Sequence, residues 1–132
     1  DKDITGLGKQ FLIFNHDALE MYRSVFICEG ALNALTIGDR AIATMGKAIS
    51  QYQVNELLKS QCQRYIILLD PDARSYAVNL ALKLVAYKKV KVVFLPEGFD
   101  VNDLGKKQTL KLVYATRYQS YQELISIRNS LK

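Results

Sequence analysis

The chain of 132 residues has two cysteines, one histidine and no tryptophan. Cys28 and Cys62 are too few and too far apart for a zinc ribbon or a disulfide framework. We therefore expect no structural zinc, two unreactive thiols and a reducing compartment. The one histidine, His16, lies outside the regularly patterned part of the chain, where we expect a surface residue. This scarcity argues against a Ser-His-Asp or Cys-His catalytic arrangement.

The sequence also lacks a long apolar segment, since no run approaches the roughly 20 residues that a membrane-spanning helix needs. Its 49% hydrophobic and 23% charged residues are ordinary for a soluble protein, and 132 residues fit one domain. No basic and apolar leader precedes a small-residue cleavage site, and the chain begins with Asp1 instead of Met. We therefore expect a piece of a longer cytoplasmic protein with no membrane partner.

The net charge of +5 is unevenly distributed. Residues 1–103 contain equal numbers of basic and acidic residues, so the excess lies in residues 104–132. The basic residues there, opposed only by Glu123, are Lys106, Lys107, Lys111, Arg117, Arg128 and Lys132. A basic tail suits a polyanionic partner, because each neutralised phosphate releases counterions. A solvated helical face, or a linker to a missing domain, explains the same pattern.

Short β-branched runs alternate with helical patterns through the middle of the chain, which is typical of βαβ units and a parallel sheet. The expected strands are 25–28, 41–44, 65–69 and 90–95. Helices are expected at 31–37, after a capping box of Ser50 and Gln53, within 72–89, and from about 103 to 131 with a break at Tyr118 or Ser120. The pattern predicts an α/β fold of about four parallel strands flanked by helices, with a helical C-terminal tail.

Apolar and aromatic residues recur on roughly one side of the expected tail helix. They are Leu110, Tyr114, Tyr118, Tyr121 and Ile125. Such a stripe favours packing in a core or an interface over stacking on nucleic-acid bases. Residues 1–24 show little regular pattern, and Gly6 and Gly8 indicate a loop or an edge hairpin.

Acidic residues follow three of the expected strands. Glu29 follows the first strand, Asp70 and Asp72 follow the third, and Asp100 and Asp103 lie in the loop after the fourth. The carboxyl ends of parallel strands meet at one edge of a sheet, so these side chains should converge. Crowded carboxylates repel one another, and a divalent cation offsets that repulsion. Mg²⁺, or Mn²⁺ in its place, suits such oxygen ligands and would attract phosphate.

Helix capping is the competing explanation for four of these acids. Asp70 suits an N-cap before Pro71, with Asp72 in the first turn, and Asp100 with Asp103 suits a capping box. Capping leaves Glu29 unexplained, since this residue follows an apolar strand and precedes Gly30. The joint pattern therefore favours a site.

Basic residues near the same edge are candidates for phosphate contacts. Lys47 follows the second expected strand, and Arg74 follows the third. Both positions are equally compatible with simple solvated charges. The segments 6–10 and 45–48 do not match a phosphate-binding P-loop, which needs two glycines flanking four residues before Lys-Ser/Thr.

Four segments together resemble a TOPRIM domain, the Rossmann-like catalytic module of bacterial and phage-type primases, topoisomerases and some nucleases. They read VFICEGALNAL, AIATMGKAIS, YIILLDPDA and VVFLPEGFDVNDLG, within residues 25–105. Among family members the primases are most similar, and LGKQFLIFNHDAL resembles the segment that leads into their domain. This resemblance implies a lead-in segment over 1–24, the TOPRIM domain over 25–105, and a basic tail or linker over 106–132.

The resemblance also implies roles for individual residues. Glu29 would be the acid/base carboxylate, Asp70 and Asp72 would hold Mg²⁺, and Asp100 matches a further acidic position. Glu29 and Asp103 are additional candidate ligands, and Lys47, Arg74, Lys106 and Lys107 are candidates for nucleotide or nucleic-acid contacts. The chain departs from the family pattern at Asn33 and Asn102, where acids are common, and at Arg74-Ser75, where primases often have Ala-Gly.

The function implied is magnesium-dependent nucleotidyl transfer: synthesis of RNA primers from ribonucleoside triphosphates on a DNA template. A replicative helicase, separate or fused, is the expected partner, in a bacterium or a phage-infected host. Two alternatives stay open on the sequence. One is a TOPRIM nuclease that hydrolyses phosphodiesters with the same acids, and the other is a noncatalytic module that binds nucleic acid or a partner through its basic tail.

Overall fold

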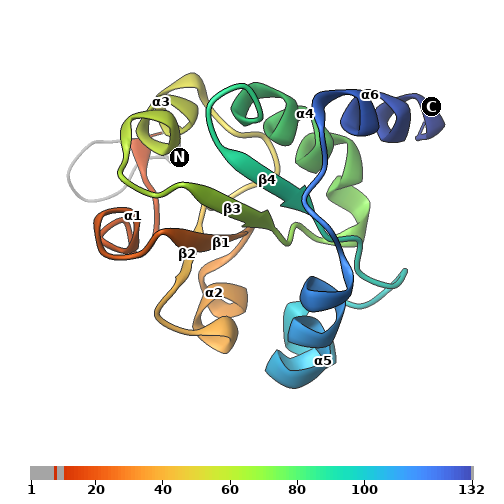
Figure 1. The fold of residues 1–132 in the computed structure, drawn as a ribbon. Helices are drawn as coiled ribbons and strands as arrows, with labels where there is room; N and C mark the ends of the chain where they lie inside the picture. Colours follow the sequence, from red (N-terminus) through yellow and green to blue (C-terminus); the bar gives the residue numbers. More distant parts are fainter. Residues whose placement is uncertain (1–7, 9–10, 132) are drawn as a thin grey trace.

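A computed structural model describes residue 8 and residues 11–131, and its centre is a parallel sheet (Figure 1). The four strands lie in the order β2-β1-β3-β4. Their bounds are Ser24–Cys28 for β1, Ala41–Ala43 for β2, Arg64–Ile67 for β3 and Lys89–Val92 for β4. All three neighbouring pairs are parallel, which confirms the predicted α/β class and the four-stranded sheet. The fold is Rossmann-like.

Helices cover both faces of this sheet. Their bounds are Ala18–Met21 for α1, Ala31–Ile37 for α2, Gln51–Lys59 for α3, Arg74–Leu84 for α4, Val101–Ala115 for α5 and Tyr121–Ser130 for α6. In Figure 1, α3, α4 and α6 lie above the sheet, and α2 and α5 lie below it. None of these helices is long and apolar enough to cross a membrane.

Two hydrophobic clusters, one on each face, hold the layers together. On one face Val25 and Ile27 of β1 pack with residues of α3, α4 and α6, and on the other Cys28 packs with α2 and α5. Because side chains alternate along a strand and both faces are covered, the strands read as continuous apolar runs in the sequence. Burial raises the pKa of the Cys28 thiol to about 12, as expected for an unreactive cysteine.

The strands end earlier than the sequence suggested. We expected strands to residues 69 and 95, but β3 ends at Ile67 and β4 at Val92. One further backbone hydrogen bond to the neighbouring strand follows the end of each of these strands. Leu68 N donates to Ile27 O at 2.8 Å, and Val93 N donates to Ile67 O at 3.1 Å. The chain then leaves the ladder, while Leu68, Leu69, Val93 and Leu95 stay buried. The apolar runs therefore continue beneath the loops that carry the acidic residues.

The tail is helical and breaks where predicted, because Ser120 caps α6 through a capping box with Glu123. The expected tyrosine stripe does not form part of the core. Tyr114 is 78% exposed and Tyr121 is 57% exposed. The buried residues in this region are Thr109 and Val113 of α5, each one position before Leu110 and Tyr114, and Leu124 of α6.

The segment between α5 and α6 covers the edge of β4. Gln119 N donates to Val90 O at 3.0 Å, and Val92 N donates to Gln119 Oε1 at 2.7 Å. The Gln119 side-chain amide also donates to Val92 O at 3.2 Å. These bonds satisfy an edge that would otherwise be open to pairing with another strand.

The lead-in segment contains a short helix, α1, that the sequence pattern did not reveal. Phe14 forms an antiparallel bridge with Ala43 of β2. Gly6 lies outside the described residues, as does Lys132 of the basic tail. His16 lies at the surface as expected, with its side chain 44% exposed and Nε2 at 2.8 Å from Oε1 of Glu56.

Candidate metal centre at the carboxyl edge of the sheet

The loops after the four strands meet at one edge and follow the strand order. Lys47 follows β2, Glu29 follows β1, and Asp70 and Asp72 follow β3. Asp100 lies in the loop after β4, immediately before α5. The parallel topology therefore brings together residues that are far apart in the sequence.

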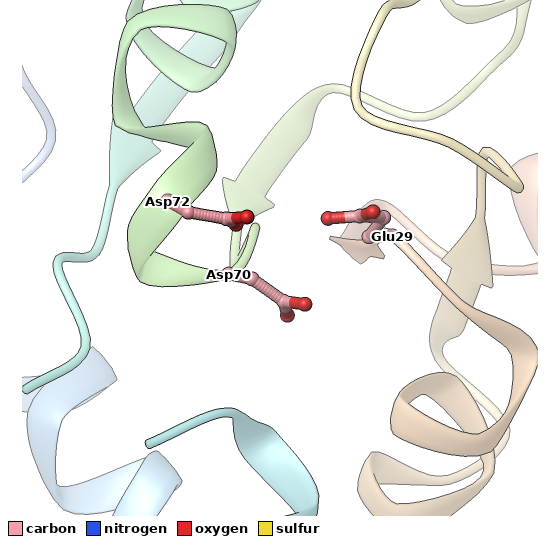
Figure 2. A group of neighbouring side chains, drawn as sticks. All are labelled: Glu29, Asp70 and Asp72. Carbon is pink, nitrogen blue, oxygen red and sulfur yellow. The ribbon is translucent and has the colours of Figure 1, made fainter. Parts of the chain in front are cut away.

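Glu29, Asp70 and Asp72 form a cluster, which we call the acidic triad (Figure 2). One carboxylate oxygen of each residue lies within 4.8 Å of the others. Figure 2 shows Glu29 facing the two aspartates across the gap between the β1 and β3 loops. This is the group of three acids that the sequence suggested as the central site.

The turn after β2 holds Glu29 from one side. Met45 N donates to Glu29 O at 2.8 Å, and Met45 has a left-handed backbone with φ of 67°. Thr44 Oγ1 donates to Gly46 O at 3.0 Å, and the buried Gln53 amide donates to Thr44 O at 2.8 Å. The turn that carries Lys47 is thus fixed both to α3 and to the backbone of Glu29.

The carboxylate of Asp70 does not cap the helix that follows it. Pro71 begins a 3₁₀ turn over Pro71–Ala73, and the Asp70 side chain forms no cap hydrogen bond there. Instead Asn33 Nδ2 donates to Asp70 Oδ1 at 3.3 Å. Helix capping therefore does not explain the Asp70 carboxylate, which contacts Asn33 of α2 and lies close to Glu29 and Asp72.

Asp100 and Asp103, by contrast, do form the capping box that the sequence allowed. Asp103 N donates to Asp100 Oδ1 at 2.8 Å, and Asp100 N donates to Asp103 Oδ2 at 2.9 Å. Neither belongs to the acidic triad. Both line a shallow hollow of about 310 Å³ together with Asp70 and Asp72. They contribute negative potential next to the triad.

The electrostatics of the triad are those of crowded carboxylates. Burial raises the pKa of Glu29, and the charges of Asp70 and Asp72 raise it further. Burial also raises the pKa of Asp70, with added contributions from Asp100 and Asp72. Glu29 Oε1 is buried and has no hydrogen-bond partner among the described residues. An unsatisfied buried carboxylate oxygen is costly unless a ligand or ion completes it.

Lys47 supplies the positive charge nearest to the triad. Its Nζ lies 2.7 Å from Asp72 Oδ2, and this hydrogen bond raises the pKa of Lys47. The same ammonium lowers the pKa of Glu29 and of Asp70. Sequence position alone did not reveal this ion pair, which crosses from the β2 loop to the β3 loop.

The donor set fits a hard divalent cation. Three carboxylates supply oxygen ligands and excess negative charge, and the unpartnered Glu29 Oε1 is an unused acceptor. Asp70 and Asp72 are the residues that would hold Mg²⁺ or Mn²⁺, and Glu29 faces them from the loop after β1.

The other candidate basic residues lie apart from the triad. Arg74 Nη2 donates to Leu95 O at 2.8 Å, and its guanidinium lies 5.3 Å from the centre of the Phe94 ring. Arg74 thus supports the loop after β4. Lys106 extends from α5 towards Gly38 at the end of α2, and Lys107 is exposed.

Two side-chain contacts join α2 to neighbouring elements, and neither was predicted from the sequence. Asn33 contacts Asp70 in the loop after β3, and the hydroxyl of Thr36 donates to Oδ1 of Asn102 at the start of α5. Asn33 and Asn102 are the two amides singled out in the sequence. Both amides connect elements of the site.

Two known proteins align with this chain. A DNA primase of Lactococcus lactis subsp. lactis (strain IL1403) is 24% identical over 116 residues, which is 81% of this chain and 18% of that protein. A DNA primase of Aquifex aeolicus (strain VF5) is 33% identical over 78 residues, which is 54% of this chain and 16% of that protein. No protein-family model matches the chain. The chain therefore contains a primase-related region and spans less than a fifth of the length of either primase.

Proposed function

We propose that this chain is the TOPRIM part of a primase, and that it carries out magnesium-dependent nucleotidyl transfer during RNA primer synthesis on a DNA template. The observation that carries the proposal is the convergence of Glu29, Asp70 and Asp72 at one sheet edge, in a chain that aligns with two DNA primases. In this proposal residues 25–105 are the catalytic domain. The boundary to the tail falls at Gly105, the one non-helical residue inside α5.

Asp70 and Asp72 are the proposed ligands of Mg²⁺, with Glu29 across from them. When bound, the cation neutralises the triphosphate and polarises the phosphorus under attack. Asn33 holds Asp70 in place through its side-chain amide. Asp100 and Asp103 strengthen the local negative potential, which attracts a cation to this edge.

Glu29 is the proposed acceptor of the proton from the primer 3′-hydroxyl. Its raised pKa fits this role, because a stronger base takes up a proton more readily, and its buried oxygen has no competing partner among the described residues. Lys47 is the proposed phosphate contact. Its Nζ lies 2.7 Å from Asp72 Oδ2 at the edge of the triad, where it would be within reach of a bound triphosphate.

Binding of a labelled ribonucleoside triphosphate to the 132-residue chain tests the proposal. We expect binding that requires Mg²⁺ or Mn²⁺ and that the Asp70→Asn/Asp72→Asn double variant loses. The Glu29→Gln variant should still bind the nucleotide. Glu20→Gln, at an exposed acid on α1, is the matched control and should bind like the wild-type chain. Triphosphate binding that is absent, or independent of both metal and aspartates, refutes the proposal.

A parallel incubation with end-labelled single-stranded DNA and Mg²⁺ distinguishes the nuclease alternative. The proposal predicts intact DNA. Metal-dependent cleavage that disappears with Glu29→Gln would instead assign phosphodiester hydrolysis to the same triad.

A further inference from the structure

A second hollow lies on the sheet face that α2 and α5 cover, and its volume is about 750 Å³. Ser24, the first residue of β1, and Arg40, which immediately precedes β2, line it. These residues mark the amino ends of the strands. The hollow is therefore at the opposite edge of the sheet from the acidic triad, and we call it the α2–α5 hollow.

The hollow lies beside the end of α2, which has 7 residues and is about 10 Å long. The neighbouring α5 has 15 residues and is interrupted at Gly105, so its part after Gly105 continues past the end of α2. Phe26 of β1 forms an apolar floor next to the buried Ile66, and Leu110 and the exposed Tyr114 of α5 flank it. In an α/β sheet such a strip is normally covered by a helix.

The rim of the hollow is basic. Arg40, Lys91 and Lys106 line it against a single acid, Asp39. Within the described part of the chain, neither Arg40 nor Lys106 forms an ion pair with a carboxylate. A Cβ on Gly38 would lie 3.6 Å from Lys106 Nζ, so this lysine reaches from α5 to the end of α2. The rim thus offers two cations that have no carboxylate partner among the described residues, beside an apolar floor.

Two of the aromatic rings at the rim, those of Tyr22 and Tyr118, are in contact with cations. The Arg40 guanidinium lies 4.9 Å from the centre of the Tyr22 ring, and Lys91 Nζ lies 4.8 Å from that of Tyr118. Lys91 also donates to the carbonyls of Val113 and Thr116, at 2.8 and 2.9 Å. These contacts leave less ring surface for stacked bases. An apolar floor with cations at its rim suits a polypeptide with carboxylates better.

We propose that the α2–α5 hollow docks an acidic amphipathic helix of a partner protein. Its apolar stripe lies on Phe26, Leu110 and Tyr114, and its Asp or Glu residues pair with Arg40 and Lys106. The helix completes the layer that α2 leaves unfinished. This inference is independent of the chemistry at the acidic triad.

Fluorescence anisotropy of designed peptides with the 132-residue chain tests the docking site. The probe is a helical peptide with a Leu/Ile stripe flanked by Glu, and its isomer has Lys in place of each Glu. We expect saturable binding of the Glu peptide and binding of the Lys isomer at least about tenfold weaker, since like charges would meet at the rim. Absence of Glu-peptide binding, or equal binding of the two peptides, overturns the proposal.

Two matched pairs of variants locate the binding. Lys106→Glu should lower the affinity for the Glu peptide at least about tenfold. Lys111→Glu, on the same helix but outside the hollow, should leave this affinity unchanged. Tyr114→Ala should also lower the affinity for the Glu peptide. Tyr87→Ala, at a similarly exposed tyrosine outside the hollow, should leave it unchanged. Equal losses within a pair would indicate unspecific attraction. Displacement of the peptide by oligothymidylate at the Lys106-dependent site would assign the hollow to nucleic acid. Either result overturns the proposal.

Discussion

Asp70→Asn should stabilise the metal-free protein while weakening its response to a divalent cation. Two unit charges 4.8 Å apart repel by about 0.9 kcal/mol in water and by about 3.5 kcal/mol at an effective dielectric constant of 20. The triad is partly exposed, so the lower value applies to each pair. Asp70 has two such neighbours in the triad, and Asp100 adds to the repulsion. The Lys47 ammonium offsets part of it. We expect a net gain of about 1 kcal/mol, or about 4 °C in Tm for a domain of this size.

The pH dependence of this gain has a definite sign. The pKa of Asp70 is raised in the folded protein, so its ionisation destabilises the fold, and wild-type stability falls as pH rises from the ordinary carboxyl range through the raised pKa. The advantage of Asp70→Asn should therefore be greatest near neutral pH and should vanish in acid, where Asp70 is protonated. Added salt should shrink it.

Thermal and urea unfolding in EDTA, and then with excess Mg²⁺ or Mn²⁺, measures both effects. At a cation concentration about 100 times Kd, the wild-type protein should gain about 2.7 kcal/mol, and the variant should gain far less. Asp17→Asn, at an exposed aspartate outside the triad, is the control. The reasoning fails if Asp70→Asn is no more stable than wild type in EDTA, or if it keeps the full stabilisation by metal.

Three further predictions concern single residues. Lys47→Met removes the ammonium that competes for Asp72, so Mn²⁺ affinity by calorimetry should rise about threefold to tenfold, and an unchanged affinity would contradict this role. Gly105→Ala should lower the free energy of unfolding in urea by about 1–3 kcal/mol, because a backbone with φ of 82° and ψ of 164° is nearly restricted to glycine. An unchanged free energy of unfolding would argue against this conformation. Thr109→Val should stabilise the protein by about 1 kcal/mol, because the buried Thr109 hydroxyl has no partner among the described residues; a clear destabilisation would reveal an unseen bond.

Sequence patterns were sufficient for the α/β architecture. Apolar runs of strand length, separated by helical periodicity, predicted the four parallel strands and the break before α6. The exact ends of β3 and β4 could not be predicted, because the apolar residues that follow them are buried although they lie outside the strands. These residues are Leu68, Leu69, Val93 and Leu95. Apolar character reports burial, and only backbone pairing defines where a strand ends.

The candidate site was predicted from topology, and its internal contacts were not. Because parallel strands direct their following loops to one edge of the sheet, the convergence of Glu29, Asp70 and Asp72 could be predicted from the sequence. Lys47 was expected near that edge, but its pairing with Asp72 depends on the path of the turn through Met45. The capping box of Asp100 and Asp103 at the start of α5 was predictable from their spacing. Only the structure shows that the Asp70 carboxylate caps no helix and accepts from Asn33 instead.

The packing of the tail shows the same limit. The predicted stripe included Leu110 and Tyr114, but the buried face of α5 lies one position earlier, at Thr109 and Val113. Helical periodicity shows which residues share a face, and it does not decide which of two neighbouring faces packs on the core. After the break at residues 116–120, Leu124 is the buried residue of α6.

Direct titration of Mn²⁺ into the protein, followed by electron paramagnetic resonance, tests the central claim that the acidic triad is a metal centre. The signal of free Mn²⁺ should fall on addition of the wild-type chain and should return when Mg²⁺ competes. The Glu29→Gln/Asp70→Asn/Asp72→Asn triple variant should leave that signal unchanged while remaining folded by circular dichroism. Equal Mn²⁺ binding by the wild-type chain and the triple variant would contradict the account.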